Sequence, residues 1–388
     1  MSFGLLALVC VAGLAGPLLA VSRRFGVPVV VGELVAGVAL GPMMVGAVHA
    51  DEPTLTFMAT IGFALVMFVA GSHVPMRDLR LRQALPVGLL NAAVVGVASA
   101  PVALGLAAVF GTGHALLYAV LLSSSSAALI LPIVQSLHLT DGPALSLLPQ
   151  VAIADAACIV ALPLAIDPVR AGRAALGATV VLACAIVLWA ALRASERRGW
   201  RASVHHLSER GKFALELRVS LVALFGLAAI AQAGGVSVML AGFASGMAVA
   251  AVGEPRRLAR QLFGVTEGFF GPLFFVWLGA SLDLHALVQR PALIGLGTAL
   301  GVGAAITHVA ARATGQPLAL GMLASAQLGV PVAAATLGGA SHLLVDGEPA
   351  ALLLGALVTI VIAAVAARLL GPRPGDEPAV SATAHPGS

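Results

Sequence analysis

Thirteen long apolar stretches follow one another along the chain, and short polar segments separate them. A helix needs about 20 mostly apolar residues to cross the hydrocarbon core of a bilayer. Stretches of this kind lie at 3–21, 28–46, 54–74, 84–110, 114–137, 144–166, 172–192, 214–233, 236–252, 263–283, 291–312, 317–342 and 350–370. We therefore predict an all-α polytopic membrane protein of about thirteen transmembrane helices over residues 1–370.

The polar segments between the predicted spans differ in charge. With the N-terminus outside, all of the 21 Lys and Arg residues except Arg170, Arg173 and Arg290 lie on or beside the inner face. Basic residues accumulate on the cytoplasmic side of membrane proteins. The pattern predicts a cytoplasmic-membrane protein with the N-terminus outside and the C-terminus inside. Residues 371–388 are rich in Pro, Gly and Ala, which predicts a disordered cytoplasmic tail.

Composition narrows the class of protein. The chain is 60% hydrophobic and 10% charged, whereas soluble domains are about a quarter charged. Aromatic residues are few and the basic residues lie in loops of one face, so nucleic-acid binding is excluded. We find no Walker loop, HExxH or GxSxG motif, and no Cys or His spacing typical of a metal site. The chain is predicted to be no enzyme, to need no cofactor and to draw energy from an ion gradient.

Two of the predicted spans are interrupted. One contains four consecutive serines, Ser123–Ser126, followed by Pro132, and the other reads AQLGVP at 326–331. Irregular backbone at membrane depth is tolerated where it is buried in protein or lines a cavity. The two spans run in opposite directions, and each is the middle member of a trio of helices. The pattern favours an inverted-repeat transporter with two discontinuous crossing helices, although a proline kink with back-bonding serines would give similar sequences.

Asp155 lies in the middle of the span after the first interruption, and that span contains no Lys or Arg. A charged side chain at the bilayer centre costs about 2.5–3.5 kcal/mol, so it needs a reason. A carboxylate there can hold a proton or a metal cation, but not both well, and this competition suffices for antiport. We predict that Ser124, Ser125, Ser126 and freed backbone carbonyls complete the ion- and proton-binding site. The alternative is a structural Asp155 bonded to backbone ends at the crossing.

Other polar residues in the spans are weaker candidates. His308 precedes the second interruption, where it could titrate, partner Asp155 or be hydrogen-bonded in a structural role. Gln150 and Gln327 are supporting candidates near the same site, and Glu33 is either a site residue or a structural partner of a basic group. Two acidic residues bracket the span 263–283, namely Glu267 and Asp283, and Asp283 is expected at the interface with water.

Several segments resemble the monovalent cation:proton antiporter-2 family, which includes the Kef-type and bacterial sodium/proton exchangers. They read VPVVVGELVAGVALGP at 27–42, IGFALVMFVAG at 61–71, SSSA at 124–127 and PLFFVWLG at 272–279. The resemblance covers about residues 1–370, the transmembrane part of such proteins. It implies that Asp155 is the essential ion-binding aspartate, that the protein is a homodimer, and that a core bundle moves against a dimerisation scaffold.

The chain departs from that family pattern at three places. Ala154 stands where a second polar residue often precedes the aspartate, which suggests exchange of one cation for one proton. Gly303, Ala304 and Ala305 occupy the region of a common Lys or Arg, with His308 nearby, and Gln327-Leu328-Gly329 replaces a common Gly-Glu-Phe.

The expected function is secondary active exchange of Na⁺ or K⁺ for H⁺ by alternating access. Two alternatives remain open from the sequence. One is a proton-coupled exchanger of an organic solute with the same fold, and the other is a membrane scaffold or sensor that does not transport.

Overall fold

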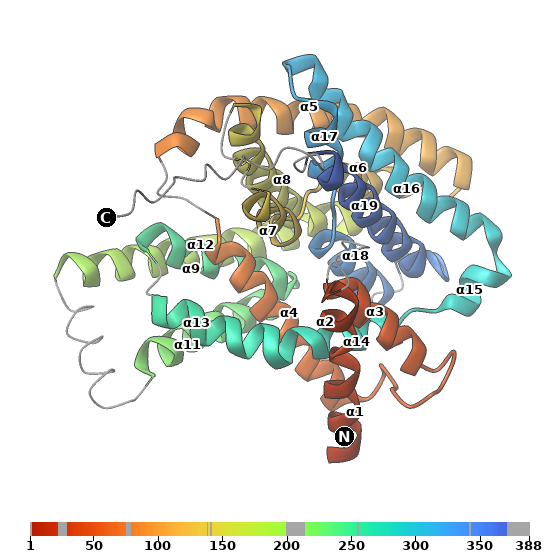
Figure 1. Ribbon diagram of the computed structural model, residues 1–388, viewed down its shortest axis with the longest axis horizontal. Helices are drawn as coiled ribbons and strands as arrows, with labels where there is room; N and C mark the ends of the chain where they lie inside the picture. The colour runs from red at the N-terminus through yellow and green to blue at the C-terminus, as the bar shows by residue number, and fades with distance from the viewer. Residues whose placement is uncertain are drawn as a thin grey trace, which may run out of the picture.

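In the computed structural model (Figure 1), the chain is described at residues 2–21, 29–74, 79–137, 139, 142–198, 214–253, 256–340 and 343–370. These residues form helices and loops and contain no strand. Ten of the apolar helical segments are long enough to cross a membrane, and three shorter ones lie at Val29–Leu40, Ala115–Leu131 and Val238–Val252. The prediction of an all-α protein with thirteen apolar segments is therefore confirmed.

The helices follow the predicted spans closely, and several spans consist of two helices. In chain order they are α1 (Phe3–Gly13), α2 (Ala15–Val21), α3 (Val29–Leu40), α4 (Pro53–Ser72), α5 (Leu79–Phe110), α6 (Ala115–Ser123), α7 (Ala127–Ser136), α8 (Pro143–Ile166), η1 (Pro168–Arg170), α9 (Ala171–Arg197), α11 (Leu215–Ala233), α12 (Val238–Val252), α13 (Arg256–Val265), η2 (Thr266–Phe270), α14 (Gly271–Ala280), α15 (Leu284–Gln289), α16 (Pro291–Val309), η3 (Ala310–Thr314), α17 (Leu318–Ala324), α18 (Gly329–Ala340) and α19 (Glu348–Leu370).

Proline explains two features that the hydrophobic pattern did not predict. The span 3–21 is broken at Leu14, because Pro17 has no N–H to bond the carbonyl four residues earlier. Pro272 has the same effect on the span 263–283, where the wide helical turn η2 precedes α14 and the Gly271 N–H bonds the Thr266 carbonyl. The span predicted at 28–46 ends earlier, at Leu40, since residues before Pro42 disfavour helical backbone.

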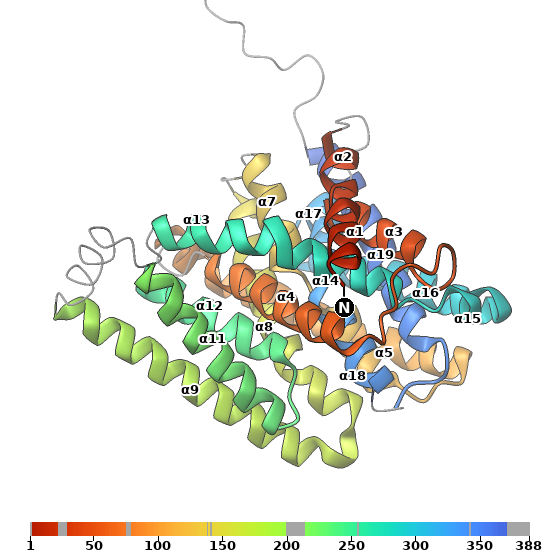
Figure 2. The same ribbon diagram turned by 90° about the horizontal axis from the view of Figure 1, so that it is seen from below.

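The helices form two bodies, which Figures 1 and 2 show from two directions. We call the first the core bundle; it consists of α5–α8 and α16–α19. We call the second the panel; it consists of α1–α4, α9 and α11–α14. The most extensive helix packing lies within the bodies, between α16 and α19 or α5 and α8 in the core bundle, and between α4 and α12 or α3 and α14 in the panel.

Glycine allows the panel helices to approach closely. A Cβ atom on Gly246 of α12 would lie 2.1 Å from the Phe68 carbonyl oxygen of α4, and one on Gly37 of α3 would lie 2.2 Å from the Val276 carbonyl oxygen of α14. Small residues at such positions bring membrane helices into backbone contact, where van der Waals packing holds them together. The panel is therefore a tightly packed unit.

The predicted orientation rests mainly on basic residues in the loops between the spans. The basic segments at 22–28 and 199–213, and the predicted tail at 371–388, lie outside the described residues. Orientation in the membrane therefore stays a prediction, and below we use "cavity side" for the ends of the helices near Asp283 and Asp346.

Candidate functional site

The two interrupted spans meet at their breaks. The first break separates α6 from α7 at residues 124–126, and the second separates α17 from α18 at 325–328. The Ser126 N–H donates a hydrogen bond of 2.8 Å to the Ala326 carbonyl, directly across the two breaks. The predicted pair of discontinuous crossing helices is therefore confirmed, and both breaks are buried in protein, as irregular backbone at this depth must be.

Side chains from neighbouring elements donate hydrogen bonds to the carbonyls at the ends of the broken helices. Gln327 Nε2 donates to the Leu121 carbonyl at the end of α6 at 2.6 Å, and Ser125 Oγ donates to the Ala324 carbonyl at the end of α17 at 2.7 Å. Thr307 Oγ1 of α16 donates to the Leu122 carbonyl at 3.0 Å. The last carbonyls of a helix have no partner within it. Here the protein supplies those partners, so these hydroxyl and amide groups hold the crossing together.

Asp155 lies at the crossing and is 4% exposed. Its Oδ2 accepts the N–H of Ala127, the first residue of α7, at 3.0 Å. A helix N-terminus carries partial positive charge, which favours a carboxylate there. Among the described residues, no donor is hydrogen-bonded to Oδ1. The site therefore combines an anchored carboxylate oxygen with a second oxygen that is open to a proton or a cation.

The second break is capped in the same way as the first, but by an uncharged side chain. Thr359 Oγ1 of α19 accepts the Gln327 N–H at 3.1 Å, just as Asp155 of α8 accepts the Ala127 N–H. In each repeat, the helix that follows the broken one caps the break. Sequence reasoning missed Thr359; the signal was a polar residue in the corresponding part of the second trio.

Replacing Thr359 with Val should destabilise the crossing. The Gln327 N–H would be left buried without an acceptor, which costs about 1–3 kcal/mol. We expect a lower thermal-unfolding temperature of purified Thr359→Val. Thr336→Val is the matched control, because the Thr336 hydroxyl bonds only carbonyls of its own helix. Equal stability of the two variants would contradict the capping role.

His308 is joined to the crossing through Ser125. Its Nδ1 lies 2.8 Å from the Ala304 carbonyl and its Nε2 lies 3.2 Å from Ser125 Oγ. A carbonyl only accepts, so Nδ1 is the donor in the first contact. The residue is 1% exposed. The structure thus places His308 beside the first break, with a serine between it and the crossing, and each ring nitrogen lies within hydrogen-bond distance of one oxygen atom.

The three predicted serines are all buried at the first break. Ser124 Oγ donates to the Leu121 carbonyl at 2.9 Å, which adds to the contacts of Ser125 and the Ser126 N–H described above. Their positions agree with the predicted site, while an ion-binding role for them stays a prediction.

The remaining candidates lie away from Asp155. Gln150 Oε1 accepts from Gln316 Nε2 at 2.6 Å, on the same helix as Asp155 but more than a turn earlier. Glu33 is buried in α3 of the panel, where Gly16 of α2 packs against its side chain. Glu267 is exposed on η2, also in the panel. Asp283 caps α15 by accepting the Ala286 N–H, and it is exposed as predicted for an interface residue.

A cavity of about 700 Å³ lies between the panel and the core bundle. Its walls come from α4, α12 and α14 on one side and from α18, α19 and the loop 344–347 on the other. Both polar and aromatic side chains line it, among them Thr60, Phe63, Trp277, Thr336 and Gln232 of α11. Asp155 does not line this cavity.

Two interrupted helices of opposite direction that cross at membrane depth are the architecture of ion-coupled secondary transporters. Residues 6–370 match the family model described as "Sodium/hydrogen exchanger, transmembrane". The chain belongs to that family, and the prediction of a multi-pass cation/proton exchanger is confirmed at this level. The match does not distinguish the antiporter-2 or Kef-type branch, so that finer assignment stays a prediction.

Individual relatives are distant. The Na⁺/H⁺-K⁺ antiporter GerN of Bacillus cereus is 23% identical over 274 residues, which cover 71% of this chain and 70% of GerN. The Na⁺/H⁺ antiporter NhaS5 of Synechocystis is 29% identical over 290 residues, which cover 72% of this chain and 40% of NhaS5. The sodium proton antiporter MjNhaP1 of Methanocaldococcus jannaschii has a similar fold, with a TM-score of 0.63 and 14% identity over 95% of this chain and 99% of that one.

Proposed function

We propose that this chain exchanges Na⁺ or K⁺ for protons and that both bind in competition at Asp155. The observation that carries the proposal is the buried carboxylate whose Oδ2 is fixed by the Ala127 N–H and whose Oδ1 has no donor among the described residues. An uncompensated charge in this place is costly, and either a proton or a cation removes that cost. The names of the relatives, which are antiporters of Na⁺, H⁺ and in one case K⁺, support the same substrates.

The break supplies further oxygen ligands. Hard monovalent cations favour oxygen ligands, and Ser124, Ser125 and Ser126 place hydroxyl oxygens and carbonyls at the same break as the Ala127 N–H. Gln327 and His308 hold this arrangement from the second repeat and from α16. Gln150 and Glu33 act outside the binding site, the first within the core bundle and the second within the panel.

The division of the helices into a core bundle and a panel supports a mechanism of alternating access. Movement of the core bundle against the panel would carry Asp155 from one side of the membrane to the other. With the N-terminus outside the cytoplasmic membrane, the cavity faces outward, and in that case the structure corresponds to an outward-facing state. The single carboxylate at the site, with Ala154 before it, favours exchange of one cation for one proton. We expect a homodimer held through the panel, as the resemblance to the antiporter-2 family implies.

Ion flux in proteoliposomes tests the function. Purified protein is reconstituted with a pH-sensitive dye inside, and an outward or inward gradient of Na⁺, K⁺ or Li⁺ is imposed. We expect at least one of these cations to move protons in the direction opposite to its own gradient. Choline serves as the control cation. If none of the three inorganic cations drives proton movement, the proposal is overturned.

The cavity favours one second candidate, a proton-coupled exchanger of an organic solute. About 700 Å³ is far more than a dehydrated cation occupies, and Phe63, Phe274 and Trp277 give the cavity an aromatic wall. A panel of organic cations in the same liposomes separates the two functions. Proton flux driven by an organic cation and by no inorganic one would favour this candidate, and no flux with either would favour a scaffold or sensor.

A further inference from the structure

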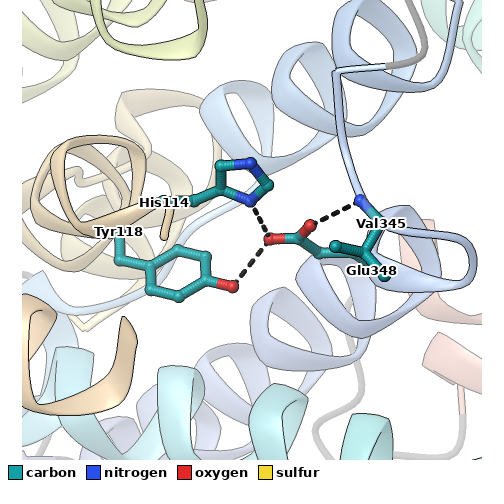
Figure 3. Close-up of polar contacts among 4 residues, drawn as sticks. All are labelled: His114, Tyr118, Val345 and Glu348. Atoms are coloured by element: carbon teal, nitrogen blue, oxygen red, sulfur yellow. Dashed lines mark hydrogen bonds and ion pairs between the residues drawn. The ribbon is translucent and has the colours of Figure 1, made fainter. Parts of the chain in front are cut away.

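A buried carboxylate remains that the proposed exchange does not use. Glu348, the first residue of α19, is fully buried with 0% side-chain exposure. Its Oε1 accepts from Tyr118 Oη at 2.6 Å and contacts His114 Nδ1 at 2.8 Å, while its Oε2 accepts the Val345 N–H at 2.9 Å. Figure 3 shows the three partners converging on the carboxylate from α6 and from the loop before α19.

The cluster joins two helices that lead to the crossing. His114 and Tyr118 stand at the beginning of α6, which ends at the first break, and Glu348 begins α19, which carries Thr359, the cap of the second break. The cluster lies at the cavity-side ends of both helices. It is therefore separated from Asp155 along the helices and fastens the two repeats to each other at one end.

His114 connects the cluster to solvent and is the member that can offset the charge of Glu348 when it is protonated. Its side chain is 24% exposed, whereas Tyr118 and Glu348 are fully buried. A buried carboxylate is tolerated when it has a hydrogen-bonded charge partner, and removal of that partner leaves an uncompensated buried charge. An imidazolium of His114 makes the cluster neutral overall. Loss of the proton leaves Glu348 with neutral donors alone.

No other described side chain takes over this role. The helices α5, α8 and α15–α18 pack against α6 or α19. Their titratable and charged side chains, with those of the adjoining loops, fall into two groups. Asp155, Cys158 and His308 are bonded at or beside the crossing, whereas His285, Arg290 and Asp346 lie at the cavity side, where His285 bonds Gln289. Of these, the Arg290 guanidinium bonds the Asp346 carbonyl and not Glu348. Arg368 lies at the opposite end of α19.

We propose that His114, Tyr118 and Glu348 form a second proton-binding site, distinct from Asp155, which holds the cavity-side ends of α6 and α19 together while protonated. Deprotonation of His114 leaves the Glu348 carboxylate buried without a cationic partner, which weakens the contact between α6 and α19. It also frees the loop 343–347, because a carboxylate that turns toward water no longer accepts the Val345 N–H. Residues of this loop line the cavity. The pH on the cavity side thereby changes the wall along which the core bundle meets the panel.

Amide hydrogen exchange of the purified protein tests this site without any ion gradient. We compare the peptide covering 343–348 at about pH 6 and about pH 9, after correction for the intrinsic exchange rate. The loop should be protected at the lower pH and should exchange about tenfold faster or more at the higher pH, because local opening becomes easier once the buried charge is unpaired. The result does not depend on whether the protein transports, so it is separable from the flux assay.

Four variants make the test decisive. His114→Gln cannot carry the extra proton and should show rapid exchange of the loop at both pH values. Glu348→Gln should also remove the pH step, and Tyr118→Phe should keep it with weaker protection overall. His285→Gln is the matched control, because His285 is exposed on the cavity side and bonds Gln289 instead. A pH step that persists in His114→Gln, or that is absent in the unaltered protein, would overturn the proposal.

Discussion

Asp155→Asn is expected to abolish cation-driven proton flux and leave the fold intact. The asparagine carbonyl oxygen can still accept the Ala127 N–H, so the capped break is preserved. The asparagine amide does not bind a proton near neutral pH, and it carries no charge that could hold a cation. Flux in proteoliposomes should therefore fall to the level of empty liposomes with Na⁺, K⁺ and Li⁺ alike, while the thermal-unfolding temperature stays close to that of the unaltered protein.

Asp167→Asn provides the matched control for this experiment. Asp167 ends the same helix and bonds the Arg170 N–H at 3.2 Å, away from the crossing. The same chemical change there should leave flux unchanged. Undiminished exchange in Asp155→Asn would show that the ion site lies elsewhere in the bundle, and it would reduce Asp155 to the structural role of capping α7.

Gly246→Ala should cause the largest loss of stability among single methyl additions to the panel. The new Cβ would lie 2.1 Å from the Phe68 carbonyl oxygen and 2.8 Å from the Ser72 nitrogen, both backbone atoms that cannot turn aside. Overpacking of this kind costs about 1–3 kcal/mol and occasionally more. We expect a markedly lower thermal-unfolding temperature in detergent, and Gly71→Ala, at 2.3 Å from the Phe243 carbonyl oxygen, should behave in the same way.

Gly96→Ala and Gly226→Ala are the controls for the helix-packing prediction. Both glycines lie in helices, and a Cβ at either position meets nothing within 4 Å. Alanine is favoured over glycine in a helix interior, so these variants should match or exceed the stability of the unaltered protein. A similar loss in all four variants would point to a general effect of glycine replacement and not to the close contact of α4 with α12.

The elements of the fold were predictable because the membrane imposes a simple length and polarity rule. Apolar stretches of sufficient length marked the spans, and Ser123–Ser126 and the AQLGVP segment marked the breaks, since few sequences tolerate such residues at membrane depth. The wide turn η2 and the break at Leu14 escaped prediction. Both follow from proline in otherwise continuous apolar runs, where hydropathy gives no indication of local hydrogen bonding.

The candidate site was predictable in part for a related reason. A lone Asp155 among apolar residues is conspicuous, whereas the partners that position it are backbone groups and common side chains. The Ala127 N–H leaves no signal in the sequence, and Thr359 is recognisable only as a polar residue in the part of the second trio of helices that corresponds to Asp155 in the first. Glu33 is the converse case: it is equally conspicuous in the sequence, but its helix belongs to the panel, and only tertiary packing shows that separation.

The hydrogen bonds across the two breaks have a consequence for the transport cycle. All of them join residues within the core bundle, so the proposed movement of that bundle against the panel would leave every one of them intact and would carry the ion in a preassembled binding site. Near the crossing, the panel surface that faces the core bundle contains flexible methionine side chains. Gly329 faces the sulfur atoms of Met67 and Met239 across the boundary, and such unbranched thioether side chains re-pack at little cost when their neighbours move.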